Sequence, residues 1–445
     1  MKISRRKFLL ASGAGALAAP GIAGLVAPKD TVEIDSERGT SLWTHEAPEL
    51  PSFPRFEGER QADLVIVGGG YTGLSCAYYA KKMRPDWTVI VLDSHTIGSG
   101  ASSRNSGSVA PYYAGKSGED AMGERGLNRL RGFIDQEQIE CDFRSISMLR
   151  MKISQEGADA ARNDDNPKTK WLSPEVMRER MGTDYYTGAV EHQGAFSVHP
   201  GKLVAGHAMA ALKVGAELFE HSAVTNIEHG KPAIITTPNG TLRAKNVFIA
   251  TNAYTPRLGL FDYKMFPLHQ YTLATRKLSK KEIQEFALDT WPMRFEKRTL
   301  PITFAMTPSG HFFVRIVLGY ASHNSSEWPD LKGARELASR IFHQRFPRIA
   351  QLGLEHGWHG VTGHTASGSQ IAGAIGEGNV HVSVAYNGLG IMPSHNNGYL
   401  TACNITGIKD QDTATLTGTS GQYFVPGDFY RSILFKPGFK MLTPV

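Results

Sequence analysis

Cysteine is scarce in this 445-residue sequence: Cys76, Cys141 and Cys403 are the only three, and they lie far apart. Three scattered cysteines cannot build the disulfide framework of a small secreted domain, and their spacing does not match that of a zinc site. Cys76 falls in an apolar, helix-like stretch, where it is predicted to be a small buried residue. Long hydrophobic runs are also absent beyond residue 27, so no later segment is predicted to span a membrane.

A strong charge of one sign is missing too. The formal net charge is +6, but Lys2, Arg5, Arg6 and Lys7 supply four positive charges in a segment that we expect to be removed. Without them, 44 basic residues face 42 acidic ones, and no long basic run remains. We therefore predict that the protein has no nucleic-acid partner.

Residues 1–27 are predicted to be a targeting segment rather than part of the fold. Residues 4–10 (S-R-R-K-F-L-L) resemble a twin-arginine export signal, and a mildly apolar stretch of small residues follows at 11–26. The resemblance implies passage through the twin-arginine export machinery and a periplasmic or exported protein. An uncleaved segment would instead anchor the protein in the membrane, and an ordinary basic N-terminus is the alternative.

Glycine, by contrast, is plentiful, and the most informative glycines lie between residues 63 and 107. The apolar run 63–67 is typical of a buried parallel strand. Residues 68–73 follow at once and contain G-x-G-x-x-G, and residues 74–82 are apolar at helical spacing. A second apolar run, 88–92, ends in Asp93. This order predicts a dinucleotide-binding unit rather than a chance glycine turn.

Each residue type in this unit has a physical role. Gly68 permits the tight turn out of the strand, Gly70 lets a pyrophosphate approach the backbone, and Gly73 lets the helix pack closely on the strand. The helix N-terminus offers free N–H groups and the positive end of its dipole to the phosphates. Asp93 stands 20 residues beyond Gly73, where a carboxylate can accept hydrogen bonds from ribose hydroxyls.

Two further segments are predicted to meet the same ligand. Residues 98–107 (G-S-G-A-S-S-R-N-S-G) are too rich in glycine and polar residues for a regular element, so we expect them to wrap around a ligand. Residues 246–254 are predicted to be a buried strand ending in A-T-N-A-Y. Small and polar residues at the C-terminal end of a buried strand indicate a ligand site.

These motifs resemble the flavin-dependent amine oxidases of the D-amino-acid oxidase family, and within it the gamma-glutamylputrescine oxidase and sarcosine oxidase branch. The resemblance extends from about residue 41 to about residue 410, and its A-S-S-R-N piece at 101–105 is more specific than the glycine turn. It implies an α/β fold: a discontinuous, Rossmann-like FAD-binding domain plus an antiparallel-sheet α+β substrate domain.

The resemblance also implies a division of the chain. An N-terminal arm at 28–60, expected to be extended, follows the targeting segment, and a C-terminal tail at 411–445 receives no role. The FAD-binding domain would comprise 61–142, 191–258 and 356–410, and the substrate domain 143–190 and 259–355. The elements expected within them include strands at 216–227, 271–275, 302–306 and 311–318 and an amphipathic helix at 336–346.

The implied cofactor is FAD, bound without a covalent link, because no cysteine or histidine matches an attachment position. The residues expected to contact it are Gly68, Gly70, Tyr71, Thr72, Gly73, Asp93, Ser94, Gly100, Ala101, Ser102, Arg104, Asn105, Val224, Thr251, Gly388, Leu389, Gly390 and Met392. The last four lie in a loop that opens a helix, whose N–H groups would stabilise negative charge on the reduced flavin.

The implied activity is oxidation of a C–N bond in a small-molecule amine or amino acid. Hydride would pass from the substrate carbon to flavin N5, and the imine would hydrolyse. Oxygen or a quinone would then accept the electrons. The alternatives are a flavin dehydrogenase that passes electrons to a quinone or carrier, a NAD-dependent enzyme, and an exported FAD-binding protein without activity. The loop at 101–105 and the strand ending in A-T-N-A-Y argue against NAD.

Residues that contact the substrate are harder to identify. Arg315, in a predicted strand, is a candidate to pair with a substrate carboxylate, although a solvated strand arginine is the simpler interpretation. His359 replaces a glycine of the family's W-G-G, so it is either a residue that reaches the flavin or substrate or a packed structural histidine. Tyr271 and Phe313 fit core packing better than the wall of a pocket.

No metal site is expected. His356, His359 and His364 form a loose H-x-x-H-x4-H pattern, but such spacing in a turn region does not build one. In the following loop, Ser367 and Gln370 stand where the family usually has an acidic or amide residue and a proline. This departure puts the family's usual substrate in doubt but not the cofactor.

Overall fold

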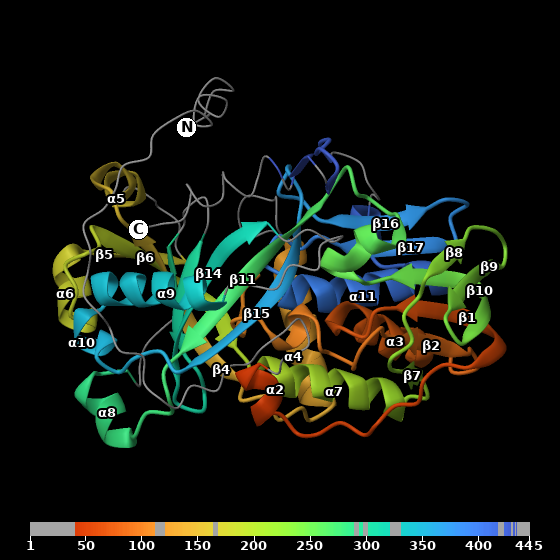
Figure 1. The fold of residues 1–445 in the computed structure, drawn as a ribbon, viewed down its shortest axis with the longest axis horizontal. Helices are drawn as coiled ribbons and strands as arrows, with labels where there is room; N and C mark the ends of the chain where they lie inside the picture. Colours follow the sequence, from red (N-terminus) through yellow and green to blue (C-terminus); the bar gives the residue numbers. More distant parts are fainter. Residues whose placement is uncertain are drawn as a thin grey trace.

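The computed structural model describes residues 41–111, 121–162, 168–288, 293–296, 301–320, 331–416, 422–428, 430, 431 and 433. The predicted targeting segment, on which the twin-arginine resemblance rests, lies outside these residues, as does the first part of the arm. The described chain folds around two sheets that lie side by side in Figure 1.

The first sheet is mainly parallel, and β1 (Gly58–Val67) is its central strand. The four residues at the end of β1, Leu64–Val67, are all buried, as expected for a strand covered on both faces. β1 pairs in parallel with β2 (Val89–Leu92) and with β10 (Gly240–Ile249). The apolar runs at 63–67 and 88–92 are therefore confirmed as neighbouring parallel strands.

The remaining strands of this sheet flank these three. They are β7 (Glu217–Phe219), β8 (Asn226–Glu228), β9 (Ala233–Thr237), β16 (Ile371–Ile375) and β17 (Val380–Val384). The strand order is β16-β17-β10-β1-β2-β7, and β9 pairs with β10 and β8.

Helices cover one face of the first sheet. α3 (Tyr71–Met83) packs between α7 (Pro200–Lys213) and α11 (Ile391–Thr406), and α4 (Ala121–Gln136) packs against α11. α11 approaches α3 closely at Gly398, where an added Cβ would lie 2.6 Å from the Thr72 carbonyl oxygen. The helix predicted at 74–82 is present and begins three residues earlier, at Tyr71.

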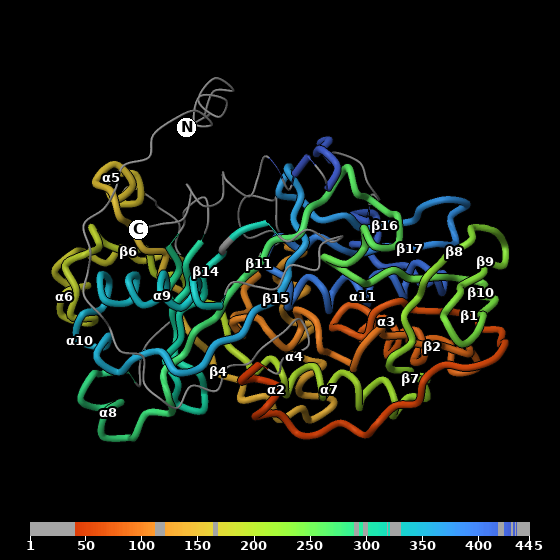
Figure 2. Tube along the Cα trace, viewed as in Figure 1, coloured from red at the N-terminus to blue at the C-terminus, as the bar shows by residue number. Residues whose placement is uncertain are grey.

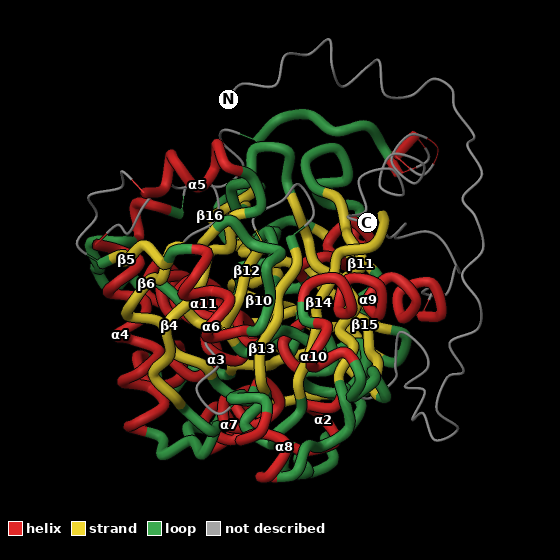
Figure 3. Tube along the Cα trace, turned by 90° about the vertical axis from the view of Figure 1, so that its left-hand side faces the viewer, coloured by secondary structure: helices red, strands yellow, loops and turns green. Residues whose placement is uncertain are grey.

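The second sheet is mixed, with strand order β15-β11-β14-β13-β12-β4-β6-β3 and β5 beside β6; Figure 3 shows β12, β13, β14 and β11 side by side. Its strands are β3 (Ser108–Val109), β4 (Arg144–Lys152), β5 (Thr169–Leu172), β6 (Gly188–Ser197), β11 (Phe266–Ala274), β12 (Met293–Glu296), β13 (Ile302–Met306), β14 (Phe312–Tyr320) and β15 (His356–His364). The predicted strands at 271–275, 302–306 and 311–318 are confirmed.

One face of the second sheet packs against α9 (Leu331–Arg345). Leu337 and Ile341 of this helix belong to the same apolar core as Tyr271, Phe304 and Ile316 of the sheet. The amphipathic helix predicted at 336–346 is therefore confirmed, and it begins earlier. The shorter helices of this half are α5 (Gln155–Arg162), α6 (Pro174–Met181), α8 (Lys280–Glu285) and α10 (Pro347–Ala350).

The chain crosses between the two sheets several times, as the tube in Figure 2 shows. Three segments assigned to the FAD-binding domain pair in the second sheet instead: β3, the end of β6, and β15. β15 pairs with β11 along its whole length, from Phe266–His364 to Ala274–His356. The sheet membership thus differs from the predicted division at 108–109, at 191–197 and at 356–364, where β3 pairs with β6 and β15 pairs with β11.

Two predicted elements differ from the structure. The strand expected at 216–227 is divided into β7 and β8, because the chain turns between them, where the Ser222 N–H donates to the Asp93 carbonyl at 2.7 Å. The arm is not extended throughout. It contains the short helix α2 (Leu42–Glu46), capped by Ser41, and its last residues already belong to β1.

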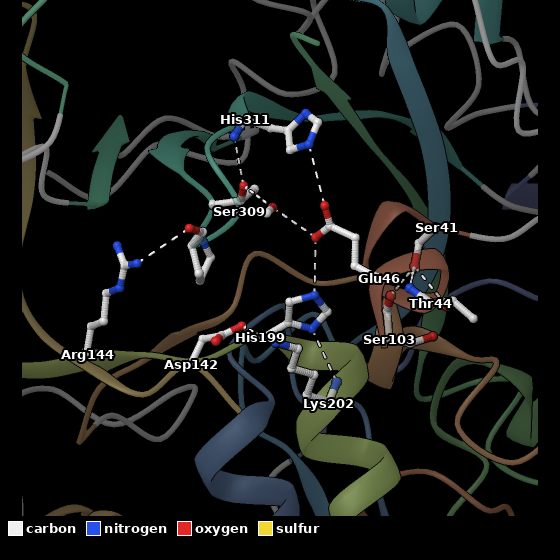
Figure 4. A network of polar contacts seen from close by, with 12 residues as sticks. Ser41, Thr44, Glu46, Ser103, Asp142, Arg144, His199, Lys202, Ser309 and His311 are labelled. Atoms are coloured by element: carbon white, nitrogen blue, oxygen red, sulfur yellow. Dashed lines mark hydrogen bonds and ion pairs between the residues drawn. The ribbon is translucent and has the colours of Figure 1, made fainter. Parts of the chain in front are cut away.

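A polar network joins α2 to both halves of the molecule (Figure 4). Glu46 accepts a hydrogen bond from Ser309 Oγ at 2.9 Å and lies 3.3 Å from His199 Nε2 and 3.4 Å from His311 Nε2. His199 begins α7, whereas Ser309 and His311 lie in the β13–β14 hairpin. Although burial alone would raise the pKa of the Glu46 carboxyl, these hydrogen bonds hold it well below its usual range.

The three cysteines are buried and free, which confirms the prediction for Cys76. None of the helices in the described part of the chain has the length and hydropathy needed to span a membrane.

Candidate cofactor and substrate site

A cavity of about 440 Å³ opens where the C-terminal ends of β1, β2 and β10 meet the second sheet. Its lining comes from segments far apart in the sequence: the glycine turn, the loop at 98–107, the end of β10, the middle of β11, and the start of α11. Ligands of open parallel sheets bind at this edge, in the crevice outside the carboxyl ends of the strands.

The glycine turn has no space for side chains. Gly68 has φ +110°, and an added Cβ would lie 2.8 Å from the Ala250 carbonyl oxygen. A Cβ at Gly70 would lie 2.8 Å from Ser102 Oγ, and one at Gly73 only 2.0 Å from the Gly68 carbonyl oxygen. Gly73 therefore fixes the contact between α3 and β1, while Gly68 and Gly70 leave bare backbone at the cavity.

Asp93 supports the glycine turn from the end of β2. Its Oδ2 accepts a hydrogen bond from the Gly69 N–H at 2.8 Å, and its Oδ1 accepts one from the His95 N–H at 2.9 Å. Burial raises the pKa of this carboxyl. Asp93 also lines the cavity, and each carboxylate oxygen keeps a free lone pair. The predicted ribose contact is therefore compatible with a role in bracing the turn.

The loop at 98–107 is held by the two residues that make its motif specific. Arg104 is largely buried and donates through Nε to the Ser99 carbonyl at 2.8 Å and through Nη1 to the His359 carbonyl at 3.0 Å. Asn105 Nδ2 donates to the Ser102 carbonyl at 2.8 Å. These bonds tie the loop to itself and to β15, so Arg and Asn are needed here for shape as well as for ligand contact.

The other predicted cofactor residues arrive from the two remaining segments. β10 ends at Ile249, before the A-T-N-A-Y motif at 250–254 begins, and a 3-10 turn at Asn252–Leu258 follows. The strand predicted at 246–254 is therefore wrong beyond Ile249. Thr251 lines the cavity at this junction, and Gly388 to Met392 line it at the start of α11. All the predicted cofactor residues line the cavity except Gly73, which packs behind it.

Arg315 lies in the wall that the second sheet contributes to the cavity. Its side chain is buried, so the interpretation as a solvated strand arginine is wrong. Nη1 donates to Gln270 Oε1 and Nη2 donates to Thr303 Oγ1 at 3.1 Å, while Nε has no hydrogen-bond partner among the described residues. Burial lowers the pKa of Arg315 to about 10, and no described carboxylate pairs with it. The cavity wall therefore carries a buried positive charge without a counter-ion.

A chain of hydrogen bonds continues from Arg315 into β15. Arginine can only donate, so Gln270 must present Oε1 to it and donate through Nε2 to Thr362 Oγ1, at 2.6 Å. Thr362 Oγ1 lies 2.8 Å from His364 Nε2. Burial, followed by the nearby Arg315 charge, lowers the pKa of His364 to about 4, so the neutral ring accepts the Thr362 proton.

The sequence analysis missed Gln270, Thr303 and Thr362. Polar residues inside otherwise apolar strands were the available signal: Gln270 and Thr272 alternate with apolar residues along β11. Such alternation indicates a strand with one polar face, here the face toward the cavity.

His359 does not line the cavity, and its side chain packs beside other rings instead. It lies on the opposite face of β15 from Thr362, with its ring centroid 6.1 Å from that of Tyr271 and 5.7 Å from that of His269. Burial, more than the neighbouring His269 and Arg104, lowers the pKa of His359 to about 3. The structure supports the packed-histidine interpretation.

Two aromatic residues and three histidines singled out in the sequence lie in the second sheet. Tyr271 and Phe313 pack in the cores on either face of the second sheet, as predicted, and neither lines the cavity. His356, His359 and His364 lie on a strand and not in a turn, and His359 faces away from the other two.

The two substituted loop residues also have partners. Ser367 Oγ donates to Gln422 Oε1 at 2.8 Å, and Gln370 Oε1 accepts from Asn397 Nδ2 at 3.1 Å. Both side chains therefore tie the loop to neighbouring segments, and neither lines the cavity.

This site and fold agree with comparisons to known proteins. The model of the DAO family, described as FAD dependent oxidoreductase, matches residues 63–403. The chain belongs to this family. The DAO-family assignment confirms the predicted FAD cofactor and the oxidoreductase class. The cavity is suited to FAD, because Gly68 and Gly70 provide bare backbone that a Cβ would obstruct, at the start of α3.

Named relatives of this DAO-family protein act on amines or amino acids by their descriptions. Gamma-glutamylputrescine oxidoreductase of Escherichia coli (strain K12) is 26% identical over 394 residues, covering 82% of this chain and 89% of that protein. Glycine oxidase of Bacillus subtilis (strain 168) is 24% identical over 334 residues, covering 71% and 85%.

Solved structures show the same fold. Glycine oxidase from Geobacillus kaustophilus aligns with a TM-score of 0.69 at 20% identity, covering 82% of this chain and 100% of that one. L-proline dehydrogenase from P. horikoshii aligns with a TM-score of 0.64 at 19% identity, covering 81% and 96%.

Proposed function

We propose that this protein oxidises the C–N bond of an amino acid, that is, of an amine whose substrate form also carries a carboxylate. The observation that supports the proposal is the buried guanidinium of Arg315 in the cavity wall, which bonds to Gln270 and Thr303 but to no described carboxylate. A buried cation without a counter-ion is costly unless an anion arrives with the ligand. A carboxylate fits the planar donor fork of arginine better than any neutral group does.

The chain's own residues would position the substrate. Arg315 would bind the carboxylate, with Gln270 and Thr303 fixing the plane of its guanidinium. Gly68, Gly70 and the start of α3 would hold the cofactor's diphosphate, and Asp93 would meet its ribose. FAD, when bound, would supply the hydride acceptor. The neutral amine would lose hydride from the carbon next to nitrogen as the nitrogen lone pair forms the C=N bond, and water would hydrolyse the resulting iminium to a carbonyl compound plus ammonium or a smaller, protonated amine.

The electron acceptor and the location belong to the same proposal. The reduced cofactor would pass its two electrons to oxygen, or to a quinone or carrier if the protein is a dehydrogenase. The twin-arginine resemblance at residues 4–10 supports export to the periplasm. We also propose that FAD is bound non-covalently. Acid precipitation should then leave the yellow colour in the supernatant and not on the protein.

Anaerobic reduction of the bound flavin tests the proposed substrate class. The holoprotein is mixed with pairs of compounds that differ only in a carboxylate, such as an amino acid and the amine left after decarboxylation. We expect loss of the flavin absorbance near 450 nm with at least one amino acid and at least about 10-fold slower reduction by its amine counterpart. Equal rates for both members of every pair, or no reduction by any, would refute the proposal.

A further inference from the structure

The wall that the second sheet contributes to the cavity carries a line of side chains across neighbouring strands. Arg315 of β14 lies directly opposite Thr303 of β13, which lies opposite Phe295 of β12. Residues opposite one another on paired strands point to the same face of the sheet, and all three line the cavity. Figure 3 shows these strands side by side. Arg315 therefore shares its face of the sheet with a phenyl ring two strands away.

Two methionines extend the apolar part of this wall. Met293 precedes Phe295 by two residues on β12, so it points to the same face, and it pairs with Met148 of β4. Both methionines line the cavity. Met293 is buried, whereas Phe295 and Met148 are partly exposed. Ser108 Oγ lies 3.7 Å from Met148 Sδ, so the thioether has a fixed neighbour. We call Phe295, Met293 and Met148 the apolar wall.

The apolar wall offers no partner to a polar or charged part of a substrate. Among the described lining residues, Arg315 is the only charged side chain that the strands of the second sheet supply. A carboxylate, ammonium or amide placed against phenyl and thioether groups would lose its hydration without gaining a hydrogen bond. An apolar chain in the same place would leave water, which improves affinity up to about 4-fold for each buried CH₂. The wall therefore favours an apolar substrate group.

The spacing of the strands indicates how large that group is. Neighbouring strands lie about 4.8 Å apart, so the backbones of Arg315 and Phe295 are about 10 Å apart. With its carboxylate on Arg315, glycine has no side chain that extends toward the apolar wall, whereas norleucine, methionine and phenylalanine do. We propose that the apolar wall is the side-chain subsite and that the substrate is an amino acid with a long apolar or aromatic side chain. This inference rests on the proposed function, because Arg315 has to hold the carboxylate.

Titration of the flavin absorbance with simple carboxylates tests the subsite without turnover. The full-length holoprotein is titrated with acetate, butyrate and hexanoate, and with adipate, which adds a second carboxylate to the chain of hexanoate. We expect the affinity to rise at least about 10-fold from acetate to hexanoate and to fall at least about 10-fold from hexanoate to adipate. Equal affinities for acetate and hexanoate would overturn the subsite and leave the proposed function standing. No binding of any carboxylate would overturn both.

A positive charge in the apolar wall should change this preference. In Phe295→Lys we expect the ratio of hexanoate affinity to adipate affinity to fall at least about 10-fold, because the ammonium can pair with the second carboxylate. Met209→Lys is the control, since Met209 is an exposed apolar residue that does not line the cavity, and it should keep the wild-type ratio. If Phe295→Lys fails to retain FAD, Met148→Lys on the neighbouring strand makes the same test. A wild-type ratio in the wall variant would overturn the subsite.

Anaerobic reduction of the flavin separates this inference from the proposed function. Norleucine is compared, at one subsaturating concentration, with 2-aminoadipate, which adds a terminal carboxylate, and with pentylamine, which lacks the carboxylate of norleucine. We expect norleucine to reduce the flavin at least about 10-fold faster than either compound. Equal rates with norleucine and 2-aminoadipate, while pentylamine is slow, would overturn the subsite alone. Equal rates with norleucine and pentylamine, or no reduction by norleucine and every other amino acid, would overturn the proposed function and the subsite with it.

Discussion

At the scale of single residues, the proposed substrate class rests on one buried guanidinium. The Arg315 guanidinium donates hydrogen bonds only to uncharged oxygen atoms, those of Gln270 and Thr303. No described carboxylate pairs with it. Neutral acceptors compensate a buried charge only in part, because the desolvation of an ion costs several kcal/mol. A ligand that supplies a negative charge would therefore stabilise this buried cation.

Removing this charge should weaken the binding of substrates that carry a carboxylate more than the binding of amines that lack one. In Arg315→Met we expect the KM of an amino acid that reduces the flavin to rise about 10- to 100-fold, because a hydrogen bond to a charged group contributes about 1.5–3 kcal/mol. Arg315→Lys should lie between, because lysine keeps the charge but not the planar fork. Steady-state kinetics with that amino acid, and with the amine that lacks its carboxylate, would measure the change in KM. An equal rise in KM for both compounds would show that Arg315 acts only on the fold.

The neighbour of Arg315 offers the converse experiment. Gln270→Glu would place a carboxylate against the guanidinium and so neutralise it from within. We expect simple carboxylates such as acetate to bind about 10-fold more weakly, while the flavin content stays the same. Titration of the flavin absorbance measures this affinity, with Gln270→Met as the control that removes the hydrogen bond without adding charge. Matching losses in the two variants would mean that charge is not the determinant.

Burial of Arg315 was not predictable from the sequence around it. Its environment is made by Gln270 and Thr303, which are 45 and 12 residues away along the chain. Only the pairing of β14 with β11 and β13 brings them together. The glycine turn could be predicted because its strand, turn and helix are adjacent in the sequence, so the geometry that a dinucleotide needs is specified locally.

At the scale of elements, one mistaken prediction concerns the position of a residue on its strand. The pattern around His359 predicts a turn, but this residue lies within β15, where alternate residues face opposite sides. The glycines at 357, 360 and 363 made this strand resemble a loop. The same small residues let β15 pass close to its neighbours: a Cβ at Gly360 would lie 3.2 Å from the Arg104 Cβ.

The contact between α3 and α11 depends on one glycine. In Gly398→Ala, the new Cβ would lie 2.6 Å from the Thr72 carbonyl oxygen and 2.7 Å from the Ser75 Cβ, so the helices must separate. Gly132→Ala in α4 is the matched control, because nothing lies within 4 Å of its added Cβ. Alanine favours a helix over glycine by about 1 kcal/mol at both positions.

We expect opposite outcomes from this pair. Gly398→Ala should lower the thermal midpoint by several degrees and release FAD more readily, since α3 begins at the cavity, whereas Gly132→Ala should raise the midpoint slightly. Thermal unfolding followed by circular dichroism and by flavin fluorescence would measure both. An increase in the midpoint of Gly398→Ala would show that the helices can repack at no cost.

Buried histidines between α7 and α11 make stability depend on pH. His207 Nε2 lies 2.9 Å from His395 Nδ1, and His207 Nδ1 lies 2.8 Å from the Leu203 carbonyl. Only one of the two facing nitrogens can carry a proton, so both rings cannot be charged together. Burial lowers the pKa of His207 to about 4 and that of His395 well below its usual range. An unfolded histidine takes up a proton near pH 6.5, so the unfolded state gains protons first.

Stability should therefore be greatest above pH 6.5 and decline as the pH falls from 6.5 toward 4. His207→Gln should reduce this decline, because the variant has one fewer buried ring with a lowered pKa. Its urea midpoint at pH 7.5 should nevertheless be lower than that of wild type, because a buried hydrogen bond is lost. Urea unfolding at pH 7.5, 6 and 5 would compare the two slopes. Parallel pH dependence in wild type and variant would exclude His207 as a source.

At the scale of the whole molecule, α2 connects the two halves through Glu46 (Figure 4). His199 Nδ1 accepts the Lys202 N–H at 3.2 Å, so its proton lies on Nε2 and points at Glu46. Ser309 donates to the same carboxylate from the hairpin of the second sheet. A single carboxylate thus accepts hydrogen bonds from the N-terminus of α7 and from the second sheet. Neither half can move away without leaving donors unpaired.

Loss of this carboxylate should weaken the whole fold. In Glu46→Gln the side chain keeps its size but loses its charge and one of its two acceptor oxygens. His199 and Ser309 share Oε2 and His311 faces Oε1, so the amide N–H₂ meets a donor at whichever position it takes. We expect the free energy of unfolding at pH 7 to fall by about 2 kcal/mol, the scale of a charge-assisted hydrogen bond. Glu49→Gln, three residues on and exposed, should change it little. Urea unfolding followed by tryptophan fluorescence would compare them, and equal midpoints would show that the two halves are held together without Glu46.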